Sequence, residues 1–460
     1  MIGWVTLLFL GCLTLDVEDD PSPADSGSAD SVTAEPGRPE LPFPPDAADS
    51  DPAAGSGFFT LSAEGGSHVV GGETFAGYAY NGSSPGPVLR ATLGDSVVVD
   101  LRNTLPDPTT IHWHGMAVPN AMDGVEWLQS PVPSMAGFTY SFTANKAGTF
   151  WYHPHVDTAR QVDLGLYGVI VVADLGEPAA DRDVVLVFDA WDEAEAGDFA
   201  ADDHTPPDPR TVRWTVNGAE SPVWNLEPGE RVRARLLNAS NTSYLALSWP
   251  GARLIGGEQG LLAAESTVAG LVLAPGDRAE VEVAAGAAAI DVTTAPWSAA
   301  GGAALGEPRT LVTVAGAEGA LGVPLPFVFS GAPPSPDPGT TDLLYTFAGG
   351  APGTDWLING ESWPDVTVRH VALDTDVVVE LHNLSATNHP FHLHGHRVEV
   401  LSVDGVPPGV ARWEDTIDVA IRSVVRLRLP ATNPGRWALH CHLLGHEQGG
   451  MMTELDVDAP

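Results

Sequence analysis

The sequence is poor in cysteine. Only Cys12 and Cys441 occur among its 460 residues. If Cys12 belongs to a leader that is removed or modified, Cys441 has no partner, which excludes a fold held by disulfides. A single thiol in an exported protein is then buried, reactive or bound to a metal.

Basic residues are also scarce. There are 21 Lys and Arg against 60 Asp and Glu, a net charge of −39, and the one lysine is Lys146. Such an excess of negative charge disfavours binding to nucleic acid or to anionic lipid. It is compatible with general solubility, so it does not identify a partner. We expect a monomer that takes small-molecule substrates.

Long hydrophobic runs are absent, and the apolar start "MIGWVTLLFLGC" is too short to span a bilayer. It ends in Gly11-Cys12 and resembles a bacterial lipoprotein signal, although Phe9 and the lack of a basic residue depart from that pattern. We therefore predict a signal over residues 1–12 and possible membrane attachment through a lipidated Cys12. The expected location is extracytoplasmic: periplasmic, on the outer membrane as a lipoprotein, or secreted.

Glycine and proline are abundant, with 50 and 40 copies, and they separate many short runs rich in Val, Leu and Thr. This pattern favours short strands in β-sandwiches over helices. Residues 13–57 contain few large apolar side chains, so we predict a disordered tether there. The Pro-rich stretch 330–341 reads as a linker between domains.

Three similar segments occur about 140 residues apart. Each begins with Asn-Gly and ends in a strand closing on Leu-x-Asn, at Asn103, Asn238 and Asn383. An Asn-Gly turn beside alternating apolar residues is typical of a β-hairpin. The repeat predicts an all-β protein of three sandwich domains, at 58–175, 176–329 and 342–460.

Histidines gather in four clusters within the first and third units: "HWH" at 112–114, "HPH" at 153–155, "HPFHLHGH" at 389–396 and "HCHLLGH" at 440–446. Residues i and i+2 of a strand face the same side, so each His-x-His can present two imidazoles to one metal site. At His440-Cys441-His442, the histidines are expected on one face and the sulfur on the other. One tripeptide would then contact two metal sites. Imidazole suits copper, zinc, iron and nickel, whereas a thiolate with imidazole and a weak thioether suits an electron-transfer copper.

These motifs, together with "NGSSPGP", "MDG" and "GTFWYHPH", resemble those of three-domain, laccase-like blue multicopper oxidases over nearly all of residues 58–460. The resemblance implies three consecutive cupredoxin-like Greek-key β-sandwich domains. It also implies four coppers per chain: one type 1, one type 2 and two type 3.

The resemblance further implies the ligands. The type 1 site would use His389, Cys441, His446 and, as a weak axial ligand, Met451. The type 2 copper would use His112 and His392. The type 3 pair would use the remaining six histidines of the pattern, which are His114, His153, His155, His394, His440 and His442. Asp123 and Glu447 match acids assigned to proton delivery. Among the other histidines, four are expected at the surface: His68, His204, His370 and His382. The fifth, His396, shares the strand parity of His392, which leaves a supporting role open.

The implied activity is one-electron oxidation of phenols or aromatic amines coupled to four-electron reduction of O₂ to water. A cuprous-ion oxidase for copper tolerance is the main alternative, although the six methionines form no cluster near the type 1 motif. Copper nitrite reductases usually have two domains and lack the full histidine set. Copper-free structural homologues have lost these ligands. The complete set disfavours both.

Overall fold

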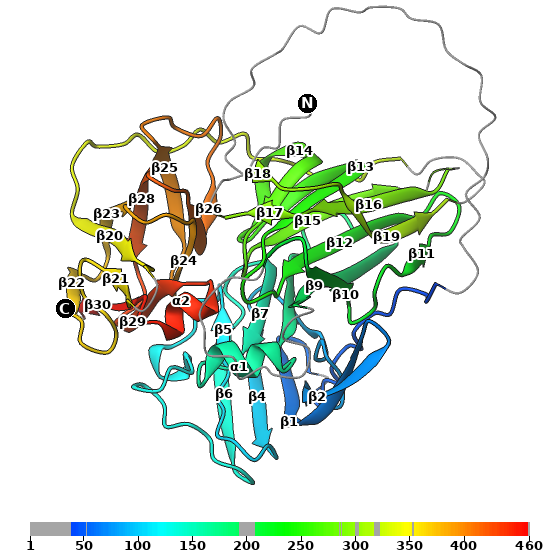
Figure 1. Cartoon of the computed structure of the whole chain (residues 1–460), viewed down its shortest axis with the longest axis horizontal. Coiled ribbons are helices and arrows are strands. Elements are labelled where there is room, and N and C mark those ends of the chain that lie inside the picture. The colour runs from blue at the N-terminus through cyan, green and yellow to red at the C-terminus, as the bar shows by residue number, and fades with distance from the viewer. Residues whose placement is uncertain are drawn as a thin grey trace, which may run out of the picture.

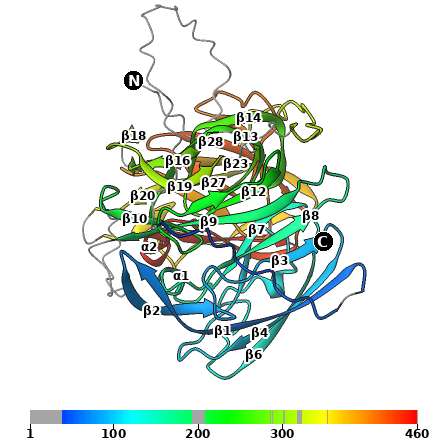
Figure 2. The same cartoon turned by 90° about the vertical axis from the view of Figure 1, so that its right-hand side faces the viewer.

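The computed structural model describes residues 38–458 apart from 52, 193–207, 285, 287, 300–302, 317–322 and 352–353. The predicted signal at 1–12 and most of the tether lie outside these ranges. The described residues form β-sheets in three units, with the first below and the second and third side by side above it in Figure 1. Figure 2 shows the first unit again beneath the other two. The all-β prediction is confirmed.

The first unit is a sandwich of two four-stranded sheets. One sheet has the strand order β2 (Glu73–Tyr80), β1 (Ser56–Val70), β4 (Ser96–Asn103), β6 (Gly137–Thr143). The other has the order β3 (Leu89–Thr92), β8 (Gly168–Ala173), β7 (Gly148–His153), β5 (His112–His114). Alternating apolar residues such as Phe59 and Leu61 fill the space between the sheets.

The third unit has two sheets, of six and five strands. The larger has the order β21 (Trp356–Ile358), β20 (Leu343–Gly349), β23 (Thr375–Asn383), β28 (Val424–Ala431), β25 (Val398–Val403), β26 (Trp413–Glu414). The smaller has the order β22 (Arg369–Ala372), β30 (Met452–Asp458), β29 (Gly435–Cys441), β24 (His389–Leu393), β27 (Thr416–Val419). Its central strand β29 is antiparallel to its neighbour β24, and the third-unit histidine motifs lie on these two strands and just after them.

The second unit is one continuous nine-stranded sheet. Its strands are β9 (Arg182–Asp192), β10 (Val212–Val216), β11 (Val223–Asn225), β12 (Arg231–Asn238), β13 (Leu245–Gly257), β14 (Gly260–Leu273), β15 (Arg278–Ala284), β16 (Ile290–Ala295) and β19 (Arg309–Ala315). The long strand β13 pairs with both β15 and β16 and so joins the halves of the sandwich. A two-stranded hairpin, β17 (Trp297–Ser298) and β18 (Ala303–Ala304), lies apart from it.

The sequence repeat corresponds to a repeated set of contacts. In each unit the first strand is parallel to the strand that closes on Leu-x-Asn: β1 with β4, β9 with β12, and β20 with β23. The asparagines Asn103, Asn238 and Asn383 are buried, and each donates its side-chain amide to two backbone carbonyls. A buried amide is retained when its hydrogen bonds are satisfied, which explains why the motif recurs.

The predicted tether differs from the structure where it is described. From residue 38 onward it packs on the first two units: Leu41 lies in the core of the second unit, and Arg38 donates to the Ser221 carbonyl at 2.7 Å. Isolated parallel β-bridges also pair Glu40 with Val223 and Asp46 with Val88. A single Leu and backbone pairing suffice to fix a segment whose composition predicts disorder. The linker at 330–341 has no helix or strand, as its proline content predicts.

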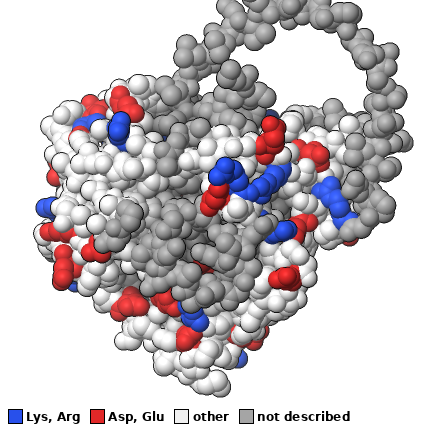
Figure 3. Space-filling view, in the orientation of Figure 1, with Lys and Arg blue, Asp and Glu red and all other residues white. Residues whose placement is uncertain are grey.

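Two short α-helices occur in the described ranges, α1 (Thr158–Asp163) and α2 (Leu444–Gln448), with a 3₁₀ turn η1 (Asn120–Met122). The helices contact each other between the first and third units, near the centre of Figure 1. None of the described helices has the length and apolarity needed to cross a membrane. On the face shown in Figure 3, acidic side chains are scattered and several have basic neighbours.

Candidate metal centre

One group of donor atoms lies within the third unit. Cys441 ends β29, His389 begins β24, and His446 lies in α2. The Cys441 sulfur is 3.5 Å from each histidine Nδ1, and the two Nδ1 atoms are 3.3 Å apart. The centre of such a triangle lies about 2.0 Å from each corner, close to the bond length between a metal ion and an imidazole nitrogen. The donor set therefore fits a metal ion.

Met451 adjoins this group. Its backbone N–H donates to the His446 carbonyl at 2.9 Å, and its carbonyl accepts from the Cys441 N–H at 3.1 Å. All four residues are at most 1% exposed. Burial raises the pKa of the Cys441 thiol well above its usual value. The thiolate therefore requires a positive partner, which a bound metal supplies.

Eight histidines form a second group where the first and third units meet. Strands β5 and β7 carry His112, His114 and His153, and His155 follows β7. Strand β24, β29 and the residues just after them carry the other four, His392, His394, His440 and His442. The Nε2 atoms of His394 and His440 are 3.0 Å apart, and those of His112 and His392 are 3.4 Å apart. All eight are at most 4% exposed.

Hydrogen bonds fix the orientation of these rings. The Nδ1 atoms of His112, His392 and His440 lie 2.9 to 3.1 Å from the backbone carbonyls of Asp123, Asp415 and Cys441. A carbonyl only accepts, so each Nδ1 carries the proton and each Nε2 presents a lone pair. Facing lone pairs at 3.0 and 3.4 Å repel unless a cation lies between them. This arrangement is typical of metal-bound histidine.

The remaining imidazoles also have ring nitrogens that are free to bind a metal. Among the described residues, Nε2 of His153, Nε2 of His155 and both ring nitrogens of His442 are buried without a hydrogen-bond partner. Burial, followed by neighbouring imidazoles, lowers the pKa of each of these histidines well below its usual value. The neutral form that results is the one that binds metal.

The two groups share one tripeptide. His440 faces His394 while the Cys441 sulfur faces His389 and His446, so alternation along β29 directs neighbouring side chains to different groups. Both groups lie in the described residues as buried clusters of metal-binding residue types. The arrangement can hold one metal beside the thiol and several metals among the eight histidines, with a short covalent path between them.

The two predicted acids have different surroundings. Asp123 follows η1 and is fully buried; its Oδ2 lies 2.8 Å from Nδ1 of His394, and its Oδ1 lies 3.3 Å from Nδ1 of His112. Glu447 is buried in α2, where burial, followed by the charges of Glu126 and Asp157, raises its pKa to about 8.

Two profiles of the multicopper oxidase family match the chain, over residues 64–177 and 335–460. The chain belongs to the multicopper oxidase family. It is a copper-dependent oxidoreductase that uses O₂. The multicopper oxidase MmcO of Mycobacterium tuberculosis is 29% identical over 84% of each chain. Laccase-1 of Trametes villosa is 29% identical over 83% of this chain and 86% of its own.

The solved structure of a laccase from Pediococcus acidilactici superposes on this chain with a TM-score of 0.79 and 25% sequence identity. The match covers 92% of this chain and 94% of the laccase chain. The cupredoxin-like fold that the sequence motifs imply is thus confirmed. The family binds copper, and the donor atoms described above fit that metal.

Sequence reasoning missed a carboxylate of the histidine cluster. The Asp415 Oδ1 atom lies 3.0 Å from the His114 Nε2, and Asp415 is fully buried just before β27. It is held from the second unit: Arg278 donates to its Oδ1 at 2.8 Å, and Glu258 accepts its backbone N–H at 2.8 Å. The sequence shows only an acid next to a short strand, because the contacts cross all three units of the oxidase.

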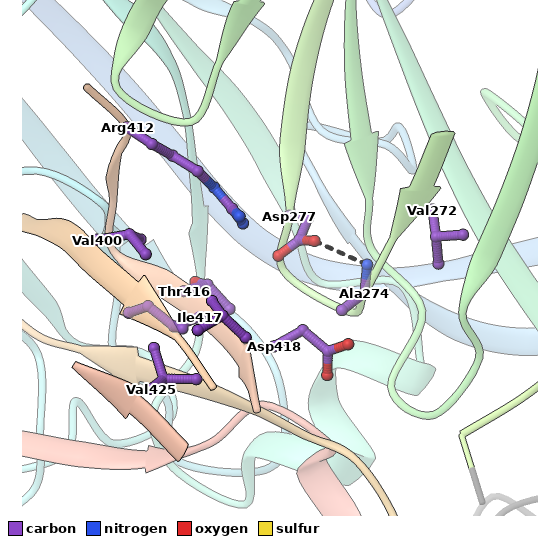
Figure 4. Close-up of a pocket in the computed structure, with 10 residues that line it drawn as sticks. Val272, Ala274, Asp277, Val400, Arg412, Thr416, Ile417, Asp418 and Val425 are labelled. Carbon is purple, nitrogen blue, oxygen red and sulfur yellow. Dashed lines mark hydrogen bonds between the residues drawn. The ribbon is translucent and has the colours of Figure 1, made fainter. Parts of the chain in front are cut away.

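A small cavity lies beside this group, between the second and third units. It is lined by Asp277, Arg412, Thr416, Asp418 and several apolar side chains (Figure 4). The Thr416 hydroxyl lies 3.0 Å from the His114 Nε2. The cavity thus adjoins the residues that contact the cluster.

The histidines outside the family pattern are placed as follows. His396 is buried with its Nδ1 3.2 Å from the His394 carbonyl, so it supports the backbone of a predicted ligand. His370 is exposed and His382 is half-buried. His68, expected at the surface, is half-buried instead with its Nε2 2.7 Å from the Leu164 carbonyl. His204 lies outside the described residues.

Proposed function

We propose that the oxidase binds four coppers, one at His389, Cys441, His446 and Met451 and three among the eight clustered histidines, and that it oxidises phenols or aromatic amines. The observation that carries this proposal is the pair of buried donor groups joined through His440-Cys441-His442. Copper held there would supply one-electron oxidation of the donor beside the thiolate and four-electron reduction of O₂ to water at the cluster.

The protein residues have three tasks. The buried imidazoles stay neutral and oriented, because carbonyls and Asp123 accept from their Nδ1 atoms. Burial excludes bulk water from the O₂-reducing site. Reduction of O₂ consumes protons, and Asp123 and Glu447 are proposed to supply them. Asp123 is suited to this task by its contact with His394 and His112.

A copper count with visible and EPR spectroscopy tests the site. Four coppers per chain and a blue absorption band are expected, and Cys441→Ser is expected to remove the band and about one copper. Met451→Leu is expected to keep the band and raise the type 1 potential, because a thioether ligand is lost. A colourless parent protein that holds fewer than four coppers would exclude the proposal.

Oxygen uptake tests the reducing substrate. A phenol, an aromatic amine and Cu(I) are compared at equal concentration, with the copper-free protein as the control. The laccases among the relatives support phenolic donors. Uptake with Cu(I) alone would replace the phenol-oxidase proposal by the cuprous oxidase. Among the described residues, Met135 is the one strongly exposed methionine, at 81%, and it lies far from Met451 in the sequence. The methionines therefore give the cuprous-oxidase alternative no support.

We further propose that the oxidase is exported, with lipid attached at Cys12, and is a monomer. The N-terminal motif supports lipidation and the acidic composition supports solubility. Mass spectrometry of the mature protein from membranes should find a lipid-modified N-terminal Cys12, and Cys12→Ala should release the protein. Light scattering of a form that begins at residue 13 should give the monomer mass.

A further inference from the structure

The predicted type 1 ligands are sealed from solvent. His389, Cys441 and Met451 are 0% exposed and His446 is 1% exposed. A donor in solution therefore has no direct contact with any of the four side chains. Each electron must cross at least one further residue before it reaches this site.

Trp356 at the start of β21 is that further residue on the His446 side. Its ring stacks on the His446 imidazole with centroids 3.8 Å apart and planes inclined by 29°. It also packs edge-on against His389 at 5.2 Å. The backbone N–H of Trp356 donates to the Gly449 carbonyl at 2.9 Å, which holds the main chain of Trp356 against the turn after α2. At 9% exposed, Trp356 reaches solvent where the ligands do not.

The protein keeps the cover over Trp356 thin. Gly350 is exposed and has a φ of +77°, and a Cβ atom there would overlap the benzo ring of Trp356. Only glycine fits this position without strain. Exposed Gly350 therefore places main chain and no side chain of its own against the outer edge of the indole, which keeps the cover at this edge thin.

Ser385 offers a second route. Its hydroxyl is half-buried and lies 2.7 Å from the His389 Nε2. A hydroxyl presents no aromatic surface to a donor, whereas an indole offers both stacking area and close contact with the imidazole. The geometry therefore favours Trp356 over Ser385.

We propose that reducing substrates deliver their electrons through Trp356, and that aromatic one-electron donors bind against its indole edge rather than against a copper ligand. This inference rests on the proposed function, because it requires copper at Cys441. Each donor loses one electron, and a phenol also releases its hydroxyl proton to water. Copper held at Cys441 would accept this electron, and four such oxidations would match the reduction of one O₂ with four protons to two waters. The indole conducts the electron without changing its own oxidation state.

The first test is the anaerobic bleaching of the blue band by 2,6-dimethoxyphenol, followed by stopped flow. Trp356→Leu keeps an apolar cover but removes the ring, so the bleaching rate is expected to fall at least tenfold. Trp356→Phe keeps an aromatic contact and should stay within threefold of the parent. Trp363→Leu is the matched control. The backbone N–H of Trp363 also donates to the turn after α2, at the Gly450 carbonyl (3.0 Å), but its ring packs on Trp127 instead of a histidine. This control variant should stay within twofold.

The second test uses the copper-free protein and does not depend on turnover. Diethyl pyrocarbonate is expected to modify His446 slowly in the parent and at least fivefold faster in Trp356→Gly, as read by peptide mass spectrometry. His370, which is exposed, serves as the internal standard. This measurement decides the covering role even if Trp356→Leu does not bind copper.

Three results would overturn the inference. The first is a bleaching rate of Trp356→Leu within twofold of the parent while the blue band is intact. The second is a larger loss of bleaching rate in Ser385→Ala than in Trp356→Leu. The third is an unchanged rate of His446 modification in Trp356→Gly. A parent protein without a blue band would instead overturn the proposed function, so the two failures are distinguishable.

Discussion

At the scale of single residues, Glu447 allows the proposed proton delivery to be separated from electron transfer. Glu447→Gln keeps the size of a side chain that is 8% exposed but cannot give up a proton. Turnover is expected to fall on the order of 100-fold, while the blue band and the rate at which donors bleach it stay unchanged. Glu126→Gln is the control, because Glu126 is an exposed acid whose charge acts on Glu447. Normal turnover in Glu447→Gln would rule out the role.

Residues whose role depends on strand parity were predictable. Strand alternation alone predicts that the side chains of Cys441 and His440 point to opposite faces, and the structure places their donor atoms in different groups. Trp356 and Asp415 were not predictable, because each acts on a histidine that lies far away in the sequence and neither belongs to a local motif. Predicting them requires knowing how β21 and β27 pack, and that depends on the whole sandwich.

At the scale of elements, strand β9 carries a buried acid whose titration the structure predicts. Asp189 is 8% exposed and accepts from the Tyr167 hydroxyl at 2.7 Å. Burial raises its pKa to about 7 from an ordinary 3.8. The folded state therefore holds this proton more tightly than the unfolded state does. The contribution of this proton to the free energy of unfolding is fully present below about pH 4. It is lost as the pH rises to about 7, and the loss is on the order of 4 kcal/mol.

The measurement is the melting temperature of the parent and of Asp189→Asn between pH 5 and 8. An amide cannot ionise but can still accept from Tyr167, so the variant should lose less stability as the pH rises. The expected result is that Asp189→Asn melts at a higher temperature than the parent at pH 8, and that the two converge toward pH 5. Parallel curves for the two proteins would contradict the assignment.

The elements themselves were predictable where a local rule governs them. Asn81, Asn217 and Asn359 each begin an Asn-Gly turn with φ between 51° and 56°, a backbone conformation that asparagine tolerates better than most residues. The order of strands in the second unit was not predictable. Its nine-stranded sheet depends on β13 pairing on both edges, and a run of alternating apolar residues is compatible with several partners.

At the scale of the whole molecule, the second unit has a role that its lack of predicted copper ligands hides. Arg278 is fully buried and contacts all three units: it donates to the Thr149 carbonyl at 3.0 Å in the first, and to Asp415 at 2.8 Å in the third. Burial lowers the pKa of Arg278, but the charges of Asp415 and Glu258 more than offset this and raise it. Arg278 thereby positions Asp415 against His114 of the cluster.

Arg278→Gln is therefore expected to lose type 2 and type 3 copper while keeping the blue band, because the residues proposed to bind type 1 copper lie wholly within the third unit. Arg235→Gln is the matched control: Arg235 is also a second-unit arginine, 1% exposed and paired with Glu280 at 2.7 Å, but it has no described contact with the histidines. Removing Arg278 takes away the arginine partner of the buried Asp415, at a cost of about 3–5 kcal/mol. Removing Arg235 leaves Glu280 with Arg233 as its remaining partner, so the cost there is smaller. Both variants should melt early, and only Arg278→Gln should lose the type 2 EPR signal. If both variants kept four coppers, or if both lost the same coppers, Arg278 would stabilise the fold without positioning the cluster.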